Sequence, residues 1–222
     1  MDPERFKNYK IKKIENSKTK CDITSKIEII GDSKVGKTSI TKKLINNNFK
    51  SEYTPTKGYE FYPYIIKIED IFIKIQLWDM SGAENYHCAL LNLYRNASIG
   101  ILVYSISDYK SFENLDTWIN EMKKYAPYSK IILLGNKADE EEKREVSYDD
   151  GKKIYEKYNL DLFMEVSAKN GFISPNFLEI AAIHLYEESL TQSDKADNTT
   201  INNSESITLS KIGGKQKVRC CI

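Results

Sequence analysis

Hydrophobic positions along the chain alternate between short apolar runs and longer amphipathic segments. The short runs, nearly all apolar and so typical of strands buried on both faces, are residues 27–30, 99–104, 131–134 and 162–166. The segments with apolar positions at helical spacing are residues 37–47, 112–122, 147–158 and 177–190. Strands that alternate with helices predict an α/β domain whose sheet is mostly parallel and covered on both faces.

A predicted hairpin belongs to this domain, and two polar end segments mark its limits. Residues 59–68 and 71–78 form a predicted hairpin, and Pro63 in its first arm favours a position at the sheet edge because proline has no N–H to donate. Residues 1–25 are polar and lysine-rich, and we expect a flexible basic extension. From residue 191 to 222 the chain is rich in Asn, Ser and Thr, which predicts a disordered tail. The expected domain is therefore residues 26–190.

Composition argues against several classes of partner and site. The chain has 222 residues, with 33 Lys and Arg against 32 Asp and Glu, so no overall charge favours nucleic acid as a partner. The four cysteines form no CxxC pair, and His87 and His184 are far apart, so neither a disulfide framework nor a Cys/His metal site is predicted. The start of the chain lacks a secretory apolar core, and no apolar run approaches the roughly 18–20 residues that span a bilayer. We expect an intracellular protein.

A phosphate-binding loop follows the first strand. The pattern G-x-x-x-x-G-K-[ST] lies between a strand and a helix, which is the context it requires. Its residues, with the one that follows, are Gly31, Asp32, Ser33, Lys34, Val35, Gly36, Lys37, Thr38 and Ser39. Glycines let backbone N–H groups turn toward phosphate oxygens, and the helix adds its positive end. Lys37 is placed to contact the β- and γ-phosphates and Thr38 to bind Mg²⁺. A simple glycine turn is the alternative, and the context disfavours it.

The base is predicted by residues at the ends of two later strands. Asp139 can only accept hydrogen bonds when ionised, and guanine presents two adjacent donors where adenine has none. Asn136 can tie this segment to the phosphate loop, and the stem of Lys137 can lie over the base. After the last strand, Ser167, Ala168 and Lys169 can present a backbone N–H to guanine O6. Each motif alone fits an ordinary surface turn, but their order and placement predict a guanine nucleotide.

With these motifs the chain resembles a Ras-superfamily small GTPase, most closely a Rab, over about residues 26–190. The resemblance implies a six-stranded mixed sheet, a GTP or GDP ligand with Mg²⁺, and GTP hydrolysis. It implies that Phe49 packs against the base edge, that Thr56 closes over the γ-phosphate and Mg²⁺, and that Asp79 holds the metal through water. It also implies that the Gly82 N–H senses the γ-phosphate, so that losing this phosphate releases Thr56 and Gly82 together. Lys37, Thr56 and Gly82 are the expected catalytic groups.

Three departures from the Rab pattern affect the expected activity. Ala83 stands where Rabs place a glutamine that orients the attacking water, and a methyl group cannot do so. We therefore expect slow intrinsic hydrolysis; Rab-directed activating proteins typically supply an Arg and a Gln, so stimulated hydrolysis would survive. Lys34 replaces a glycine that Rabs usually have in the phosphate loop. We favour a side chain that is directed to solvent. The alternatives are that Lys34 adds positive charge near the nucleotide or blocks a finger residue that enters the site from outside. Lys57 replaces an apolar residue on the surface that effectors contact.

The last residues indicate a lipid anchor. Cys220 and Cys221 resemble the Rab signal for two geranylgeranyl groups, and Arg219 excludes a CaaX box. Two lipids give stable membrane residence where one does not. Lys211, Lys215, Lys217 and Arg219 favour an anionic leaflet. Incidental thiols are the alternative.

The resemblance also implies partners and location. We expect a monomer that recruits effectors in vesicle trafficking through the surfaces between Tyr53 and Phe61 and between Ala83 and Tyr94. Other expected partners are an exchange factor, an activating protein, an escort protein with its prenyltransferase, and a dissociation inhibitor. The protein would lie on the cytoplasmic face of a membrane and cycle with the cytosol. A GTP-loaded scaffold that hardly hydrolyses GTP stays open, whereas a phosphotransferase is disfavoured because no second-substrate segment is evident.

Overall fold

A computed structural model describes residues 9–15, 18–82, 91–171 and 177–201. The strands are β1 (Ile11–Ile14), β2 (Ile23–Ile30), β3 (Tyr59–Ile68), β4 (Ile71–Met80), β5 (Ile99–Ser105), β6 (Lys130–Asn136) and β7 (Leu162–Glu165). The α-helices are α1 (Lys37–Asn46), α3 (Tyr109–Glu113), α4 (Leu115–Tyr125), α5 (Tyr148–Tyr158) and α6 (Phe177–Ile201), with 3₁₀ turns η2 (Leu91–Tyr94) and η3 (Glu141–Lys143). Every strand and helix predicted from the apolar pattern is present.

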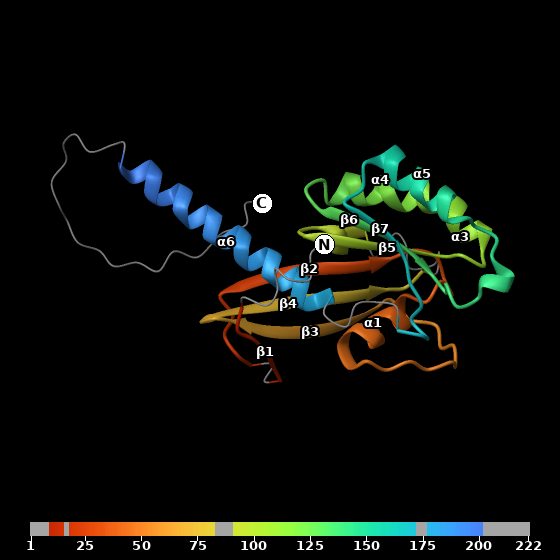
Figure 1. Ribbon diagram of the computed structural model, residues 1–222, viewed down its shortest axis with the longest axis horizontal. Coiled ribbons are helices and arrows are strands. Elements are labelled where there is room, and N and C mark those ends of the chain that lie inside the picture. The colour runs from red at the N-terminus through yellow and green to blue at the C-terminus, as the bar shows by residue number, and fades with distance from the viewer. Residues whose placement is uncertain (1–8, 16–17, 83–90, 172–176, 202–222) are drawn as a thin grey trace. The chain divides into compact units, whose positions relative to one another are not determined.

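One sheet contains all seven strands in the order β1-β3-β4-β2-β5-β6-β7 (Figure 1). Four neighbouring pairs, from β4–β2 to β6–β7, are parallel, and the β1–β3 and β3–β4 pairs are antiparallel. The expected mixed, mostly parallel sheet is confirmed, with seven strands rather than six. Parallel pairing aligns the carboxyl ends of β2, β4, β5, β6 and β7 at one edge of the sheet, where open α/β sheets bind ligands.

The seventh strand comes from the segment that we expected to be a flexible extension. Residues 11–14 pair antiparallel with β3, from Ile11 opposite Ile68 to Ile14 opposite Ile65. Only these two isoleucines of β1 are half-buried, which is too short a pattern to predict a strand. The strand β1, not β3, is therefore at the edge of the sheet. Pro63 lies opposite Gln76 of β4 and beyond the end of β1, so no residue of β1 is paired with it.

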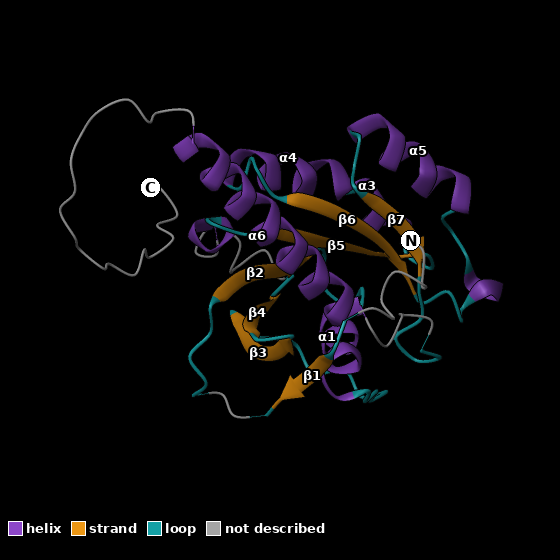
Figure 2. Ribbon diagram, turned by 60° about the vertical axis from the view of Figure 1, so that its left-hand side comes forward, coloured by secondary structure: helices purple, strands orange, loops and turns teal. Residues whose placement is uncertain are grey.

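Helices cover both faces of the sheet, as predicted (Figure 2). On one face, Ile40 of α1 and Ala182 of α6 belong to a buried apolar cluster with the strands. On the other, Trp118 and Ile119 of α4 belong to a second cluster. These two cores fix the strands, and through them the loops at the carboxyl edge.

Two helices differ from the prediction. The expected helix over residues 112–122 is interrupted at Asn114, which ends α3 and begins α4. The last helix continues to Ile201, although we expected disorder from residue 191. No glycine or proline occurs between residues 177 and 201 to stop it. The chain divides into a unit of residues 1–187 and a second unit from 188 to 222.

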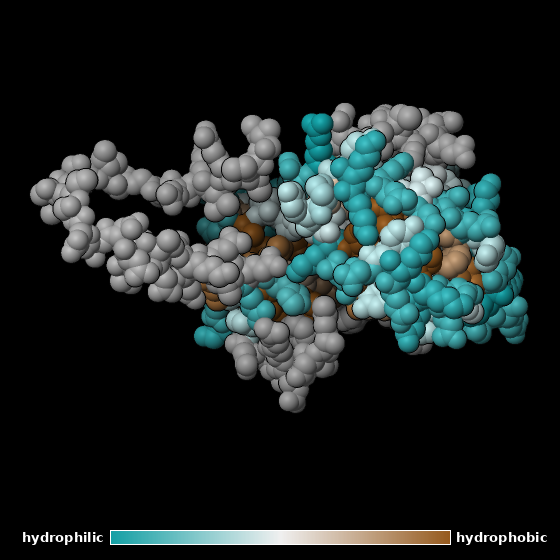
Figure 3. Space-filling view, turned by 90° about the horizontal axis from the view of Figure 1, so that it is seen from above, coloured by the Kyte–Doolittle hydropathy of each residue, from teal (hydrophilic) through white to brown (hydrophobic). Residues whose placement is uncertain are grey.

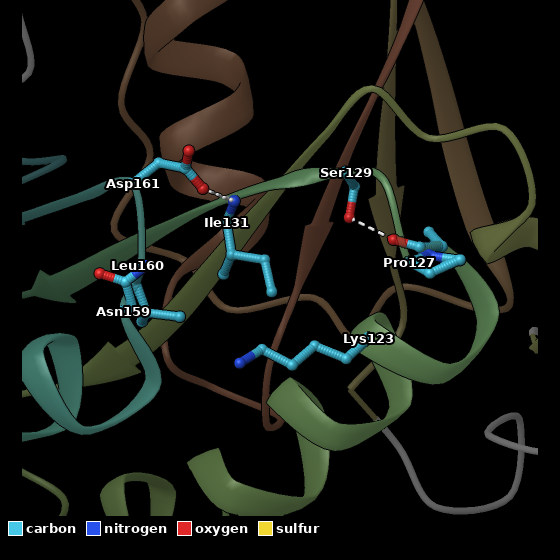
Figure 4. Close-up of a pocket in the computed structure, with 8 residues that line it drawn as sticks. Lys123, Pro127, Ser129, Ile131, Asn159, Leu160 and Asp161 are labelled. Atoms are coloured by element: carbon cyan, nitrogen blue, oxygen red, sulfur yellow. Dashed lines mark hydrogen bonds between the residues drawn. The ribbon is translucent and has the colours of Figure 1, made fainter.

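The amino-terminal end of the strands holds a small pocket, about 250 Å³ in volume, between the end of α4 and the start of β6 (Figure 4). Two polar groups that line it already have hydrogen-bond partners within the protein. Asp161 accepts from the Ile131 N–H at 2.7 Å, and Lys123 donates to the Tyr158 carbonyl at 3.0 Å. On the surface seen from above, hydrophobic residues are mostly recessed between hydrophilic ones (Figure 3). The candidate chemistry therefore lies at the other end of the strands.

Candidate nucleotide-binding site

The phosphate loop connects β2 to α1 at the carboxyl edge. Gly31 has φ of 132°, and a Cβ there would lie 2.2 Å from the Val103 carbonyl oxygen. Gly36 has φ of 98°, and its Cβ would lie 2.2 Å from the Asn136 amide nitrogen. Both glycines are thus required by backbone conformation and by close approach. The sequence motif adopts the strand–loop–helix arrangement that it predicted.

Lys34 also adopts a left-handed conformation, with φ of 66°. This conformation suits glycine and strains a lysine by about 1 kcal/mol. Its side chain is exposed, with the ammonium nitrogen 6.0 Å from the centre of the Tyr53 ring. The expected solvent-directed orientation agrees with this exposure, while the ammonium stays near the loop that carries Thr56.

Lys37, the first residue of α1, is buried and directs its ammonium to the start of the phosphate loop. Its ammonium donates hydrogen bonds to the carbonyl oxygens of Gly31, at 2.8 Å, and Asp32, at 2.6 Å. Burial lowers the pKa of Lys37 to about 8, and the charges of Asp79 and Asp32 oppose this change. A buried cation whose hydrogen bonds within the described residues go to loop carbonyls is a strong candidate to bind a phosphate.

Three oxygen-bearing side chains from distant segments meet beside Lys37. The Thr38 hydroxyl lies 2.5 Å from Asp79 Oδ2 and 2.9 Å from the Thr56 hydroxyl. Burial raises the pKa of Asp79 to about 6, and its Oδ1 has no hydrogen-bond partner among the described residues. Mg²⁺ prefers oxygen ligands and completes its shell with phosphates and water. These three side chains, one with a free oxygen, therefore fit an Mg²⁺–phosphate site.

The predicted base-binding residues form a connected network at the ends of β6 and β7. The Asn136 amide donates to the Val35 carbonyl at 2.7 Å, tying this segment to the phosphate loop as expected. Its Oδ1 accepts from the Ala168 N–H at 3.2 Å. Asp139 accepts from the Ser167 hydroxyl at 2.6 Å. The carboxylate is thereby fixed in orientation, with capacity left for further donors.

The remaining predicted residues lie around these two centres. Lys169 places its ammonium 3.7 Å from Asp139 Oδ2. Lys137 has φ of 66° and is half-buried. Phe49 is half-buried and packs against the core cluster that includes α1. Ser33 within the loop and Ser39 in the first turn of α1 are partly exposed.

Gly82 follows β4 and touches the phosphate loop. A Cβ at Gly82 would lie 2.3 Å from the Asp32 carbonyl carbon and 2.4 Å from the Ser33 nitrogen. Only glycine permits this approach, which brings the Gly82 backbone beside the loop. The next residue, Ala83, and the cysteines Cys220 and Cys221 lie outside the described residues.

Two residues that the sequence did not indicate reach the phosphate loop from the helices. Asn114 and Trp118 donate to the two carboxylate oxygens of Asp32, at 2.6 and 2.7 Å. Trp118 is buried, with 8% of its surface exposed. The available signal was the i, i+4 spacing of two side-chain donors on one helical face.

Similarity to known proteins extends over most of the chain. The Ras family model matches residues 26–184. The chain is 34% identical to "Ras-related protein Rab-15" of Rattus norvegicus over 165 residues, covering 74% of this chain and 78% of that protein. It is 32% identical to "Ras-related protein RABA1g" of Arabidopsis thaliana over 208 residues, covering 90% and 94%. It is also 32% identical to "Ras-related protein Rab11B" of Nicotiana tabacum over 207 residues, with the same coverage.

Proteins of this family bind GTP or GDP with Mg²⁺, and the Thr38–Thr56–Asp79 oxygens, the buried Lys37 and the Asp139 network occupy the same edge of one sheet. The chain belongs to the Ras family and is a divergent Rab-type small GTPase.

Proposed function

We propose that the chain is a membrane-anchored GTP/GDP switch that recruits effectors in vesicle trafficking and hydrolyses GTP slowly by itself. The contact of Thr38 with both Thr56 and Asp79 is the observation that carries this proposal. It joins the first helix, the loop before β3 and the end of β4 at one point. A ligand that supplies phosphate oxygens and Mg²⁺ there would hold all three segments together, and a ligand without the γ-phosphate would release one of them.

Guanine selection in this proposal rests on Asp139. Ser167 occupies one side of the carboxylate at 2.6 Å and leaves acceptor capacity for the two adjacent donors of guanine. The side chain of Asp139 is only 10% exposed, so an unsuitable base would leave a mostly buried carboxylate unsatisfied. ATP is therefore expected to bind much more weakly than GTP.

For hydrolysis, the groups of this chain act mainly by position and charge. Lys37 already lies in the loop and would exchange its carbonyl contacts for phosphate oxygens as the γ-phosphate is attacked by water. The Gly82 backbone lies beside the loop, and the Thr56 hydroxyl lies 2.9 Å from the Thr38 hydroxyl; both residues would align groups at the γ-phosphate. Bound Mg²⁺ would neutralise phosphate charge. No side chain of this set accepts a proton from the attacking water.

Ala83 accounts for the slow rate in this proposal, because its methyl group cannot hold the attacking water. Single-turnover hydrolysis of preloaded GTP, compared between the wild-type chain and Ala83→Gln, tests it. The glutamine variant should hydrolyse GTP at least tenfold faster. Equal rates would contradict the assignment of slow hydrolysis to Ala83.

A scaffold that stays loaded with GTP is a second candidate, and Ala83 favours it too. The same measurement with an added Rab-directed activating protein separates the two functions. Stimulated hydrolysis of the wild-type chain supports a switch, while GTP that stays intact in its presence supports the scaffold.

Anchoring is proposed on Cys220 and Cys221 with the basic residues that precede them. In the described part of the chain, no helix has the length and apolar character needed to cross a membrane. Mass spectrometry of the protein isolated from cells tests the proposal. Two geranylgeranyl additions are expected, and two unmodified cysteines would contradict it.

Effector recruitment is proposed on the surface between Tyr53 and Phe61 and on the segment between Ala83 and Tyr94. Tyr53, Tyr59 and Phe61 are 57%, 45% and 40% exposed. The rings of Tyr59 and Phe61 both lie 5.0 Å from the Trp78 ring, so they form one aromatic surface beside Thr56. Exposed aromatic groups next to a nucleotide-sensing loop suit binding that depends on the nucleotide. The exchange factor, activating protein, escort protein with prenyltransferase and dissociation inhibitor are proposed from the family.

A further inference from the structure

The second residue of the phosphate loop carries a carboxylate that is hydrogen-bonded to two side chains of the helical layer. Asp32 accepts from Asn114 Nδ2 through Oδ2, at 2.6 Å, and from Trp118 Nε1 through Oδ1, at 2.7 Å. Both are hydrogen bonds to a charged acceptor, which are shorter and stronger than those between neutral groups. Each carboxylate oxygen thus has a donor on the helical layer.

The two donors are held rigidly relative to each other. Asn114 joins α3 to α4. One helical turn later, the backbone N–H of Trp118 donates to the Asn114 carbonyl at 3.3 Å. Trp118 lies in the core cluster that also contains Leu115 and Ile119. A side chain bound to this pair is therefore fixed to the core of the domain, unlike a loop residue supported only by its neighbours.

The main chain of Asp32 is the point where several groups of the site meet. Its carbonyl oxygen accepts from Lys37 at 2.6 Å. The Gly82 backbone approaches the same peptide, since a Cβ at Gly82 would lie 2.3 Å from the Asp32 carbonyl carbon. The orientation of this one peptide therefore affects both the cation that would bind phosphate and the glycine that would sense it.

We propose that Asn114 and Trp118 are positioning residues that, through the Asp32 carboxylate, hold the phosphate loop in its nucleotide-binding shape. They do not touch the ligand. They fix the Asp32 peptide, and so the direction of the loop N–H groups and of Lys37. The proposal rests on the GTP/GDP binding proposed above, and extends it to the rate at which nucleotide is lost.

The test measures release of fluorescent GDP from the full chain in excess GDP and Mg²⁺. Asp32→Ala removes the acceptor, and Trp118→Phe removes one donor while keeping a ring in the core. Asp32→Ala should release GDP about tenfold faster and Trp118→Phe about fivefold faster. The double variant should be no faster than Asp32→Ala alone, because Trp118 acts only through Asp32.

A matched control separates this role from the general effect of removing a polar group from a buried ring. The Tyr104 hydroxyl is buried and has no hydrogen-bond partner among the described residues, so Tyr104→Phe removes an O–H that makes no such contact. It should change GDP release by less than twofold. Asn114→Ala provides a second donor deletion if Trp118→Phe does not fold, and should also release GDP about fivefold faster.

Wild-type release rates in both Asp32→Ala and Trp118→Phe would overturn the inference. Fully additive effects in the double variant would overturn it as well, because Trp118 would then act by packing and not through Asp32. A wild-type chain that binds no GDP in Mg²⁺ would instead refute the proposed nucleotide binding itself. Faster release with non-additive effects supports the inference.

Discussion

The base half and the phosphate half of the site are built differently. In the base half, Asn136, Asp139 and Ser167 are joined to each other or to the phosphate loop by hydrogen bonds between 2.6 and 3.2 Å. In the phosphate half, Lys37 contacts loop carbonyls and one oxygen of Asp79 is without a hydrogen-bond partner among the described residues.

The difference concerns what a ligand has to change. A base can bind to a network whose side chains are already oriented, which favours selectivity without rearrangement. A phosphate must replace contacts of Lys37 and hold Thr56 near Thr38, so its loss has structural consequences. We infer that the base half sets which nucleotide binds and the phosphate half responds to its state.

The largest effect is expected from changing the base half at Asp139. In Asp139→Asn the carboxylate that accepts two donors becomes an amide that presents a donor of its own to guanine. Loss of hydrogen bonds to a charged group costs about 3 kcal/mol, or about a hundredfold in GTP affinity. Competition binding with GTP and ATP measures this.

Affinity for ATP serves as the control, because adenine makes no use of the carboxylate. ATP binding should stay within about twofold to threefold of its wild-type value. An equal loss for both nucleotides would mean that Asp139 supports the fold and does not select the base.

Asn136→Ala should destabilise the whole domain. The Val35 carbonyl and the Ala168 N–H would both lose a buried partner, which costs about 2–3 kcal/mol in the free energy of unfolding. Urea denaturation without nucleotide measures the change, and Asn120→Ala on the exposed face of α4 is the control. A loss below about 0.5 kcal/mol would show that the base half is not preformed.

A smaller effect is expected from a buried carboxylate within the strand that leads to the phosphate loop, Glu28 of β2. Burial raises its pKa to about 7 from an ordinary value of 4.5, although Lys26 lies 2.8 Å from Oε1 and lowers that pKa. Below pH 4.5 the group is protonated in both the folded and unfolded states. As the pH rises from 4.5 toward 7, Glu28 ionises in the unfolded state before it ionises in the folded state. The contribution of the protonated carboxyl to the free energy of unfolding is therefore lost as the pH rises through this range.

At pH 8, the free energy of unfolding of Glu28→Gln should therefore be about 1–2 kcal/mol higher than that of the wild-type chain. The variant should accordingly unfold at a higher temperature. The difference should shrink toward zero as the pH is lowered from 7 to 4.5. Thermal unfolding at a series of pH values checks this. A difference that is constant with pH would exclude ionisation of Glu28 as its cause.

The smallest effect concerns Lys34, which is exposed and lies 6.0 Å from the Tyr53 ring centre. Lys34→Met keeps the strained backbone position occupied by a long side chain and removes the charge. GDP release should become about twofold faster at low salt and return to the wild-type rate at high salt. Lys110→Met, at an exposed position on α3, should have no effect at either salt concentration.

The sequence predicted those parts of the site that depend on local patterns. Gly31 and Gly36 indicated the shape of the phosphate loop. A short apolar run indicated the strand that ends at Asn136, and the second arm of the predicted hairpin indicated the strand that leads to Asp79. The closing of Thr56 over the γ-phosphate and Mg²⁺ was implied only by the family resemblance, because no local pattern indicates how a loop without periodicity closes.

What the sequence did not predict depends on contacts between distant segments. The strand β1 has only Ile11 and Ile14 half-buried, and its existence depends on the unpaired edge of β3. Asn114 and Trp118 contact Asp32 across more than 80 positions of the chain. Such pairs appear only when the sheet and helices are assembled.

Hydrogen exchange of the chain loaded with GDP or with a non-hydrolysable GTP analogue tests the central difference between the two halves most directly. We predict that amide protection around Asn136, Asp139 and Ala168 is the same in both states. Protection around Thr56 and Gly82 should be markedly higher with the GTP analogue. Equal protection at Thr56 and Gly82 in the two states, or a change of the same size in the base half, would contradict the account.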